Sequence, residues 1–314
     1  MNDSVNKRGT LICIAGPTAS GKTALAIRLA HELGTEIISA DSMQLYRYMD
    51  IGTAKPSMEE QEGIPHHMLD IIDPCEDYSA ARYAEEAGRK AEDMLARGLI
   101  PIVAGGTGLY LDALTGSRSF EDEPDDPSVR ARLTSEADEL GNAAMHSRLA
   151  EIDPESAARI HENDIKRTVR ALEIYYLTGE TATERNRRAA ARPPRFNTIK
   201  ICLDWQDREA LYSRINRRTK LMMDCGLEDE ARRIRAMHPG HTASQAIGYK
   251  ELFRYFDGLC SLDEAVEDIA RESRRYAKRQ LTWFRRDSAM LRVEASDPES
   301  CFSSVKTYIF QNLL

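Results

Sequence analysis

The stretch Gly-Pro-Thr-Ala-Ser-Gly-Lys-Thr at residues 16–23 is a complete phosphate-binding motif, and it decides the fold. An apolar run at residues 11–15 precedes it, and a helical pattern at residues 22–33 follows it. A strand, a glycine-rich turn and a helix in this order direct backbone N–H groups toward a di- or triphosphate. Lys22 adds a positive charge, and the Thr23 hydroxyl is placed to bind Mg²⁺. The motif predicts an anion site built from Gly16, Pro17, Thr18, Ala19, Ser20, Gly21, Lys22 and Thr23.

Further apolar runs at residues 36–40, 99–104 and 198–203 alternate with helical patterns, the longest at residues 79–97. This alternation predicts an α/β fold of the P-loop NTPase-like type, a parallel sheet flanked by helices. The first strand runs into the phosphate loop, the second ends at Asp41, and the third runs into a Gly-Gly-Thr-Gly turn at residues 105–108. Because ligands bind at the carboxyl edge of such sheets, we expect these three segments to share a site.

Residues 120–195 interrupt the alternating pattern. They begin with an acidic, proline-broken loop at residues 121–127, continue as helix with no clear strand, and end at Pro193-Pro194. We predict an all-helical insertion domain at residues 120–195, set into a P-loop core of residues 1–119 and 196–314. The C-terminal part of that core, from residue 207 onward, is predicted to be nearly all helix.

Composition narrows the function classes. The chain has 314 residues, of which 42% are hydrophobic, so a sizeable core is expected. No stretch has the length of a signal peptide's apolar region or a membrane span, and the six cysteines form no Cys-x-x-Cys pair. These features predict a cytoplasmic protein without a zinc site or disulfide framework. Residues 1–164 carry 15 Lys/Arg against 30 Asp/Glu, whereas residues 165–314 carry 28 against 21, so the second half is basic.

Carboxylates beside the loop could perform chemistry. Asp41 is placed to accept a proton from a group that attacks the bound phosphate ester, with a turn cap as its alternative role. The third strand lacks the second acidic metal ligand of an NTPase. Asp204 closes a later apolar run and could supply that ligand, so a kinase function is not excluded at this point. The pair His66-His67 fits no metal-ligand spacing, so a packing or turn role is favoured there.

Two cationic segments fit phosphate chemistry. Arg214 and Arg218 lie one turn apart on a helix that Asp207 is predicted to cap, and paired guanidinium groups can clamp phosphate oxygens, although surface arginines at this spacing are common. Residues 271–286 carry seven cations interleaved with Tyr276, Trp283 and Phe284. Cations that neutralise phosphates, together with aromatic faces that stack on bases, indicate single-stranded RNA, because a merely solvated face needs no aromatic residues.

Several sequence blocks occur in a fixed order along the chain. They are residues 16–23, Asp41-Ser42-Met43-Gln44, residues 50–56, His66-His67, Gly105-Gly106-Thr107-Gly108-Leu109-Tyr110, Ala171-Leu172-Glu173, Gln245-Ala246-Ile247-Gly248-Tyr249-Lys250 and Tyr276-Ala277-Lys278-Arg279-Gln280-Leu281-Thr282-Trp283-Phe284. In this order the blocks resemble those of bacterial tRNA dimethylallyltransferases. The resemblance extends from about residue 10 to residue 287, and the zinc finger of the eukaryotic members has no counterpart here. It implies that the helical C-terminal part of the core binds tRNA.

The resemblance implies transfer of the five-carbon group of dimethylallyl diphosphate to the N6 amine of the adenine 3′ of the anticodon, in tRNAs reading codons that begin with U. It implies that Asp41 is the general base and that Thr107 takes part in catalysis. We predict that Arg218 is the catalytic arginine that clamps the diphosphate, with Arg214 and Arg217 as alternatives. The resemblance also implies Mg²⁺ on Thr23, and a monomer.

By the same resemblance, tRNA contacts are expected at Asp41, Ser42, Met43, Gln44, Thr107, Arg130, Lys166, Arg167, Thr168, Val169, Arg170, Gln245, Ala246, Ile247, Gly248, Tyr249, Lys250, Lys278, Arg279, Gln280 and Trp283. Two rival hypotheses stay open at this point. One is a small-molecule kinase that uses Asp204 and Asp41, and the other is a non-catalytic RNA-binding protein that senses a nucleotide.

Overall fold

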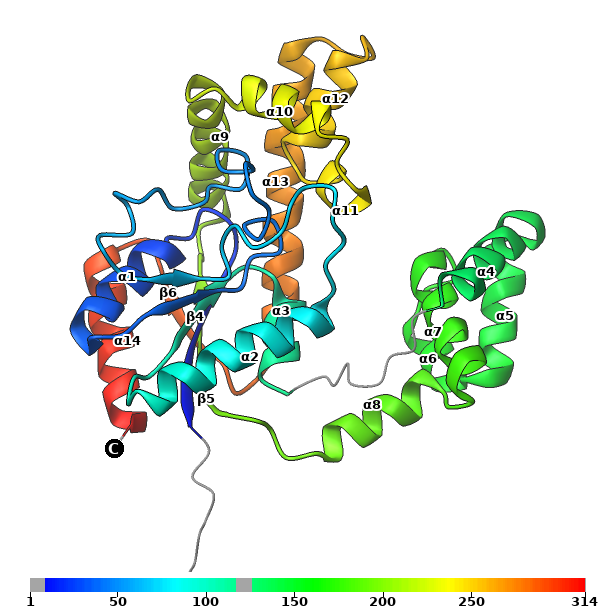
Figure 1. Cartoon of the computed structure of the whole chain (residues 1–314), viewed down its shortest axis with the longest axis horizontal. Coiled ribbons are helices and arrows are strands. Elements are labelled where there is room, and N and C mark those ends of the chain that lie inside the picture. The colour runs from blue at the N-terminus through cyan, green and yellow to red at the C-terminus, as the bar shows by residue number, and fades with distance from the viewer. Residues whose placement is uncertain (1–8, 117–125, 314) are drawn as a thin grey trace, which may run out of the picture. The chain divides into compact units, whose positions relative to one another are not determined.

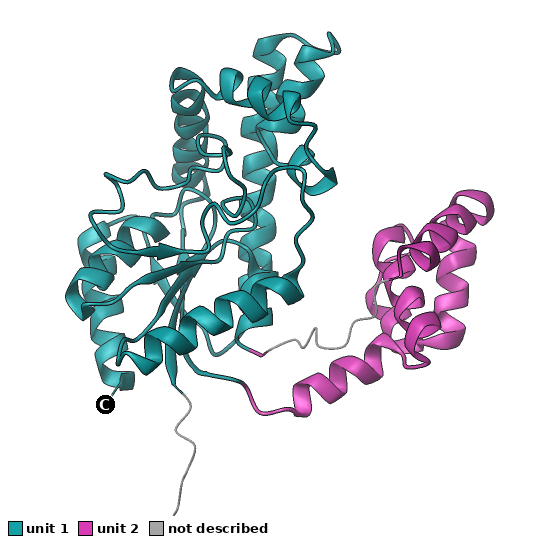
Figure 2. Cartoon of the chain, viewed as in Figure 1, with its two compact units in different colours: residues 1–115, 195–314 teal, residues 116–194 magenta. Residues whose placement is uncertain are grey.

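The structure, a computed structural model, describes residues 9–116 and 126–313. The chain forms two compact units, one of residues 1–115 and 195–314 and the other of residues 116–194 (Figure 2). The predicted domain boundary between residues 119 and 120, and most of the predicted acidic loop, lie outside the described residues. The second unit ends at residue 194, next to the predicted boundary at residue 195.

The first unit is built on a six-stranded sheet in the order β3-β2-β4-β1-β5-β6, and every strand pair is parallel (Figure 1). The fold class predicted from the sequence is confirmed. Two strands were not predicted, β3 because it has only two residues and β6 because it follows a long helix. The strands are β1 (Thr10–Ala15), β2 (Ile37–Ser39), β3 (His66–His67), β4 (Ile102–Gly105), β5 (Asn197–Asp204) and β6 (Leu291–Glu294).

Helices cover both faces of this sheet. Successive side chains of a strand point to opposite faces, and so Leu11 and Cys13 of β1 pack with the α2 side while Ile12 and Ile14 pack with the α1 side. These strand residues are almost fully buried. The helices of the first unit are α1 (Lys22–Leu33), α2 (Ala80–Ala96), α3 (Gly108–Leu114), α9 (Arg208–Asp224), α10 (Leu227–Ala236), α11 (His241–Ser244), α12 (Tyr249–Phe256), α13 (Leu262–Phe284) and α14 (Pro298–Leu313).

Side-chain caps determine where the helices that carry the site begin. Asp207 accepts hydrogen bonds from the N–H groups of Glu209 and Ala210 at the start of α9, as predicted. At the start of α13, Ser261 and Glu264 form a reciprocal capping box. Figure 1 shows α9 to α13 gathered beyond one end of the sheet.

That end is the carboxyl edge. In the strand register Ala15, the last residue of β1, lies opposite Gly105 of β4 and Cys202 of β5. Ser39, the last residue of β2, lies opposite Ala104. The phosphate loop, Asp41 and the Gly105–Gly108 turn therefore emerge side by side, as the sequence predicted.

The regular elements among the described residues of the second unit are all helices, and the unit has a core of its own, formed by Leu133, Met145, Leu149 and Leu172 among others. The fully buried Glu173 carboxylate pairs with Arg130 at 3.1 Å and with Arg170 at 2.7 Å. The helices are α4 (Pro127–Leu140), α5 (Asn142–Ile152), α6 (Pro154–Arg159), α7 (Ile165–Thr178) and α8 (Ala182–Ala191).

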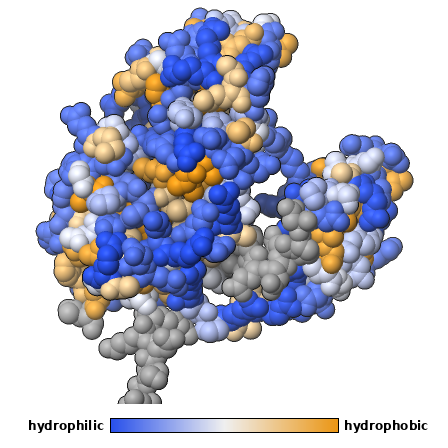
Figure 3. All heavy atoms as spheres, in the orientation of Figure 1, coloured by the Kyte–Doolittle hydropathy of each residue, from blue (hydrophilic) through white to orange (hydrophobic). Residues whose placement is uncertain are grey.

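The face drawn in Figure 3 is predominantly hydrophilic. Large apolar side chains that are exposed, such as Met58, Leu140 and Leu259, are far apart in the sequence. Among the described residues, none of the helices combines the length and the apolar character that crossing a membrane requires.

Candidate active site

The phosphate loop connects β1 to α1, and its conformation depends on glycine. Gly21, the N-cap of α1, has a φ of 95°, a left-handed conformation that favours glycine. Because α1 begins at Lys22, the N–H groups of its first turn have no partner within the helix and face the loop. The Ser20 hydroxyl oxygen is buried and makes no hydrogen bond within the protein. The loop therefore presents donors suited to an anion.

Two cations are desolvated beside this loop. Burial lowers the pKa of Lys22 to about 8, and the nearby Asp41 carboxylate opposes that shift. Burial also lowers the pKa of Arg218, again against the effect of Asp41. The Lys22 ammonium donates to the Pro17 carbonyl oxygen at 2.7 Å. A bound diphosphate would supply the negative charge that stabilises both cations in this setting.

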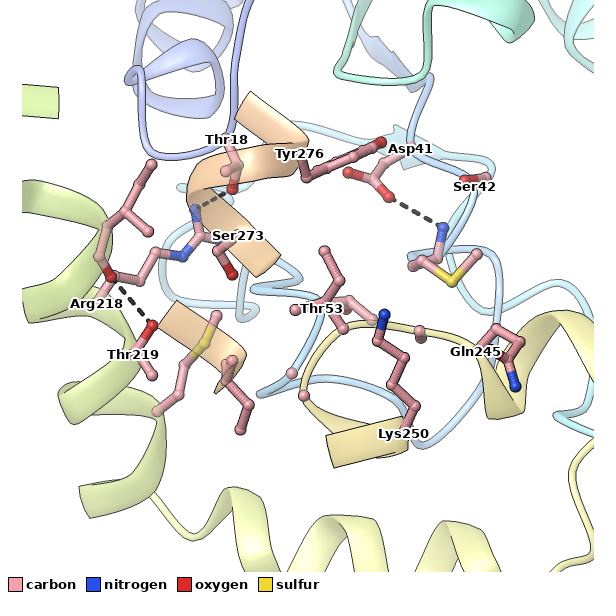
Figure 4. Close-up of a pocket in the computed structure, with 18 of the residues that line it drawn as sticks. Thr18, Asp41, Ser42, Thr53, Arg218, Thr219, Gln245, Lys250, Ser273 and Tyr276 are labelled. Atoms are coloured by element: carbon pink, nitrogen blue, oxygen red, sulfur yellow. Dashed lines mark hydrogen bonds between the residues drawn. The ribbon is translucent and has the colours of Figure 1, made fainter. Parts of the chain in front are cut away.

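A cavity of about 270 Å³ opens next to the loop (Figure 4). Its polar lining comes from the loop, from the segment after β2, and from α9, α12 and α13. The residues that line it are Thr18, Asp41, Ser42, Met43, Gly52, Thr53, Ile215, Arg218, Thr219, Met222, Gln245, Ala246, Ile247, Gly248, Lys250, Ile269, Ser273, Tyr276 and Arg279. Segments far apart in the sequence thus form one site.

Asp41 follows β2 and lines this cavity. Its Oδ1 atom accepts a hydrogen bond from the Met43 N–H at 3.0 Å, which caps the turn that follows (Figure 4). The two roles considered for this residue are compatible, because one carboxylate serves the turn and still faces the cavity. A base in this position could receive a proton from a nucleophile bound there.

Thr107 lies behind Asp41 and is not part of the cavity lining. Its Oγ1 atom accepts the Ser42 N–H at 2.9 Å and lies 3.2 Å from the Ser42 hydroxyl oxygen. Thr107 thus fastens the turn after β4 to the Asp41–Gln44 segment. Its predicted part in catalysis stays a prediction.

The structure distinguishes the three arginines considered for the clamp. Arg218 lines the cavity and donates from Nη1 to the Thr18 hydroxyl oxygen at 3.3 Å (Figure 4). Arg214 donates from Nε to the Ala19 carbonyl oxygen at 3.1 Å and lies over the Trp205 ring. Arg217 is exposed and outside the cavity lining. Arg218 is therefore the arginine in position to meet a ligand.

Several cavity residues were missed by sequence reasoning, including Thr219, Ser273 and Tyr276. Ser273 and Tyr276 are three residues apart on α13 and so share a helix face. Burial and the Asp41 carboxylate raise the pKa of Tyr276 to about 12, so its phenol stays protonated at neutral pH. Sequence reasoning grouped Tyr276 with the RNA-facing aromatics, whereas helical spacing would have placed it on the inward face.

The segment around residues 50–52, for which the sequence indicated no chemical role, is held by one buried carboxylate. Glu230 of α10 accepts the backbone N–H groups of Asp50, Ile51 and Gly52 at 2.9–3.0 Å. The Tyr249 hydroxyl donates to the same carboxylate at 2.6 Å. Because Gly52 and Thr53 line the cavity, Glu230 fixes one wall of the site from outside it.

Replacing Glu230 with alanine is expected to lower the free energy of unfolding by about 3 kcal/mol, because three N–H groups and a hydroxyl lose a charged acceptor. Denaturant unfolding of the purified protein measures this change. Glu228→Ala on the same helix is the matched control. It removes only a surface pair with Arg232 and should cost less than about 1 kcal/mol. Equal losses in the two variants would contradict the assignment.

The residues considered for a metal site or for a kinase make other contacts in the structure. His67 pairs with Glu36 at 2.7 Å, and His66 Nδ1 lies 2.8 Å from the Ile64 carbonyl oxygen. Asp204 accepts the Trp205 N–H, lies 3.6 Å from Arg285 and is not part of the cavity lining. Across residues 9–116 and 126–313, no group of three His, Cys, Asp or Glu side chains could hold a metal ion.

The donor set at the loop nevertheless fits Mg²⁺ bound through a diphosphate. Thr23, at the start of α1, is exposed. Mg²⁺ is commonly bound by one or two protein oxygens, with phosphate oxygens and water completing its coordination. One threonine hydroxyl beside the anion site meets that need without a carboxylate cage.

The residues predicted to contact tRNA lie in several environments, and their role stays a prediction. Lys166, Arg167 and Lys278 are exposed. Arg130 and Arg170 pair with the Glu173 carboxylate. The predicted contacts that line the cavity are Asp41, Ser42, Met43, Gln245, Ala246, Ile247, Gly248, Lys250 and Arg279. Those with buried side chains outside the cavity lining are Thr168, Val169, Tyr249 and Gln280.

A parallel sheet with a phosphate loop at its carboxyl edge, and a carboxylate and an arginine facing one cavity, define a P-loop enzyme that acts on a phosphorylated ligand. The chain belongs to the IPP transferase family, whose model matches residues 44–287. An isopentenyl transferase model matches residues 9–73. The resemblance derived from the sequence blocks is confirmed.

Named relatives agree with this assignment. The chain is 49% identical to a tRNA dimethylallyltransferase of Shouchella clausii over 92% of this chain and 93% of that one. It is 45% identical to the tRNA dimethylallyltransferase of Bacillus subtilis over 89% of each chain. Among solved structures, the tRNA isopentenylpyrophosphate transferase of Bacillus halodurans matches with a TM-score of 0.73 and 40% identity, covering 98% of this chain and 97% of that one. A eukaryotic dimethylallyltransferase acting on tRNA matches with a TM-score of 0.79 and 30% identity, over 93% of this chain and 75% of that one.

Proposed function

We propose that this protein transfers the dimethylallyl group of dimethylallyl diphosphate to the N6 amine of the adenine 3′-adjacent to the anticodon in tRNA. The observation that carries the proposal is the arrangement of the phosphate loop, Arg218 and Asp41 around one cavity. This arrangement supports the proposal of a departing diphosphate bound beside a base. The named relatives support the transfer to tRNA, and the family resemblance supports the target adenine in tRNAs that read codons beginning with U.

In the proposed reaction the allylic carbon–oxygen bond breaks, and its electron pair leaves with the diphosphate. The adenine amine nitrogen attacks the allylic carbon, and its proton passes to Asp41 and then to water. An adenine amine is a weak nucleophile because its lone pair is delocalised into the ring. Catalysis therefore rests on stabilising the leaving group, for which Lys22 and Arg218 are placed. Mg²⁺ bound with the diphosphate through Thr23 would neutralise further negative charge.

The nucleophile must be brought to Asp41. An adenine in a loop can leave its stack at a cost of a few kcal/mol. Ser42, Met43 and Asp41 line the cavity next to one another and are proposed to hold the base, with Gln44 beside them. The Gln44 amide nitrogen is hydrogen-bonded to the Thr53 and Ala54 carbonyl oxygens, so Gln44 contributes by shaping this wall.

The decisive experiment incubates purified protein with unmodified tRNA, Mg²⁺ and radiolabelled dimethylallyl diphosphate, followed by nucleoside analysis. Label in N6-dimethylallyladenosine at the position 3′ of the anticodon is the expected result. Absence of label with consumption of ATP would instead support a kinase. Tight tRNA binding without product, unchanged in Asp41→Ala, would support a non-catalytic RNA-binding protein. A tRNA substrate favours a cytoplasmic location, and we propose that the protein acts as a monomer.

The RNA role of α13 can be tested separately. Lys278 and Arg279 are exposed neighbours on this helix. The double variant Lys278→Ala with Arg279→Ala is expected to weaken tRNA binding and to reduce the slope of log Kd against log salt by about 1–2, because up to two phosphate contacts are lost. Binding titrations at several salt concentrations measure both effects. Because Arg279 also lines the cavity, dimethylallyl diphosphate affinity is compared in Lys278→Ala alone, where it should be unchanged. An unaltered salt slope in the double variant would refute the role.

A further inference from the structure

Gln280 lies between the two exposed cations of α13 and the phosphate loop, and its side chain points inward. It is only 5% exposed although it adjoins the exposed Arg279. Its Oε1 atom accepts the Thr18 N–H at 2.8 Å. Its Nε2 atom donates to the Gly106 carbonyl oxygen at 2.9 Å. A single amide side chain therefore joins the helix to the phosphate loop and to the turn after β4.

Two glycines of that turn give α13 the room to approach. A Cβ atom on Gly106 would lie 2.2 Å from Gln280 Nε2, and a Cβ atom on Gly108 would lie 2.3 Å from the Trp283 ring. Either contact would force the facing side chain to move. The close approach of α13 thus depends on both glycines, and the Gly106 site accommodates the Gln280 amide in particular.

Thr18, which Gln280 contacts, and its neighbour Ala19 are also held by α9. Arg218 donates to the Thr18 side chain, and Arg214 donates to the carbonyl oxygen of Ala19. Ala19 has a φ of 63°, a left-handed conformation that costs free energy for a residue with a Cβ atom. The loop therefore keeps its shape because helices outside it hold Thr18 and Ala19 in place.

We propose that Gln280 is a positioning residue that couples tRNA binding on α13 to diphosphate binding in the loop. The inference rests on the proposed function, because both ligands are those of that reaction. RNA phosphates that neutralise Lys278 and Arg279 stabilise one position of α13. Because the Gln280 side chain accepts the Thr18 N–H, that position of the helix also fixes the position of Thr18 in the phosphate loop. The loop is then already shaped when diphosphate arrives. By linkage, diphosphate tightens tRNA binding by the same factor.

The test measures the dissociation constant of inorganic diphosphate with Mg²⁺, with and without saturating unmodified tRNA, by calorimetric titration. Inorganic diphosphate carries no prenyl group, so no turnover interferes. In the wild-type protein, tRNA is expected to tighten diphosphate binding about fivefold or more. The quantity compared is the ratio of the diphosphate dissociation constant without tRNA to that with tRNA. In Gln280→Leu, which keeps the size of the side chain but loses both hydrogen bonds, this ratio is expected to fall below about twofold.

A second variant reaches the same contact from its other side. Gly106→Ala displaces the Gln280 amide without changing α13, and it should reduce the ratio in the same way. Arg167→Ala is the control, because Arg167 is an exposed predicted tRNA contact that does not belong to α13. It should weaken tRNA binding yet keep the ratio once tRNA is saturating. Thermal melting of each variant reports its folding, so Gly106→Ala carries the test if Gln280→Leu does not fold.

Three outcomes would overturn the inference. In the first, tRNA does not change the diphosphate affinity of the wild-type protein. In the second, the ratio is unchanged in both Gln280→Leu and Gly106→Ala. In the third, Gln280→Leu binds tRNA more weakly when diphosphate is absent, yet its ratio is unchanged. The last outcome would make Gln280 an RNA contact. Failure of the proposed function is seen elsewhere, as absence of labelled product from the wild-type protein, and the two failures are therefore distinguishable.

Discussion

Replacing Asp41 with asparagine is expected to reduce kcat for prenyl transfer by about 10²–10⁴-fold, the range typical for loss of a general base. The asparagine amide keeps an oxygen that can accept the Met43 N–H bond, so the turn after β2 should persist. It has no carboxylate to take the proton from the attacking amine. Single-turnover rates with labelled dimethylallyl diphosphate isolate this step from product release.

Binding measurements separate chemistry from assembly in this experiment. The dissociation constants for tRNA and for diphosphate should change far less than kcat in Asp41→Asn. Asp77→Asn removes an exposed carboxylate outside the cavity and serves as the matched control, with wild-type rates expected. Prenyl transfer that continues undiminished in Asp41→Asn would eliminate Asp41 as the base while leaving the overall function intact.

The second large effect is expected at Arg218. Alanine at this position should lower kcat/KM for dimethylallyl diphosphate by about 10²–10³-fold, because a desolvated guanidinium that meets the departing diphosphate is lost. Lysine should recover only part of this loss, since an ammonium group cannot bind two oxygens through a planar fork. Steady-state kinetics at saturating tRNA measure both variants.

The neighbouring arginine supplies the control for this experiment. Arg217→Ala changes the same helix by one position, but Arg217 is exposed and outside the cavity lining. Its kcat/KM for dimethylallyl diphosphate should stay within about twofold of the wild-type value, as expected for a surface change that leaves the transition state untouched. Equal losses at positions 217 and 218 would show that α9 acts through its overall charge.

Much of the fold was predictable because local sequence and tertiary structure agree there. The phosphate motif with its flanking strand and helix required β1 and α1, and Asp207 marked the beginning of α9. The strands β3 and β6 could not be predicted in this way. β3 has two residues, and its pairing with β2 comes from the sheet and not from any pattern of its own.

The candidate site also contains some residues that the sequence could identify and others that it could not. Asp41 and Lys22 were identifiable because each stands next to a strand end or motif that fixes its surroundings. Tyr249 and Gln280 are predicted by resemblance to contact tRNA, and this stays a prediction. Their hydrogen bonds to the Glu230 carboxylate and to the Thr18 N–H of the phosphate loop were not predictable from the sequence. The two residues and their partners are separated by up to 262 positions in the chain, so no local pattern could connect them.

The sequence by itself determined the parallel sheet, the anion site and the gathering of three segments at one edge, because strand direction and helix polarity follow from local order. Tertiary structure alone decided which of the three arginines lines the cavity and which carboxylate supports the cavity wall. Arg214, Arg217 and Arg218 have the same chemistry and belong to one helix. They differ only in the direction in which each side chain points, and packing of α9 against the rest of the unit sets that direction.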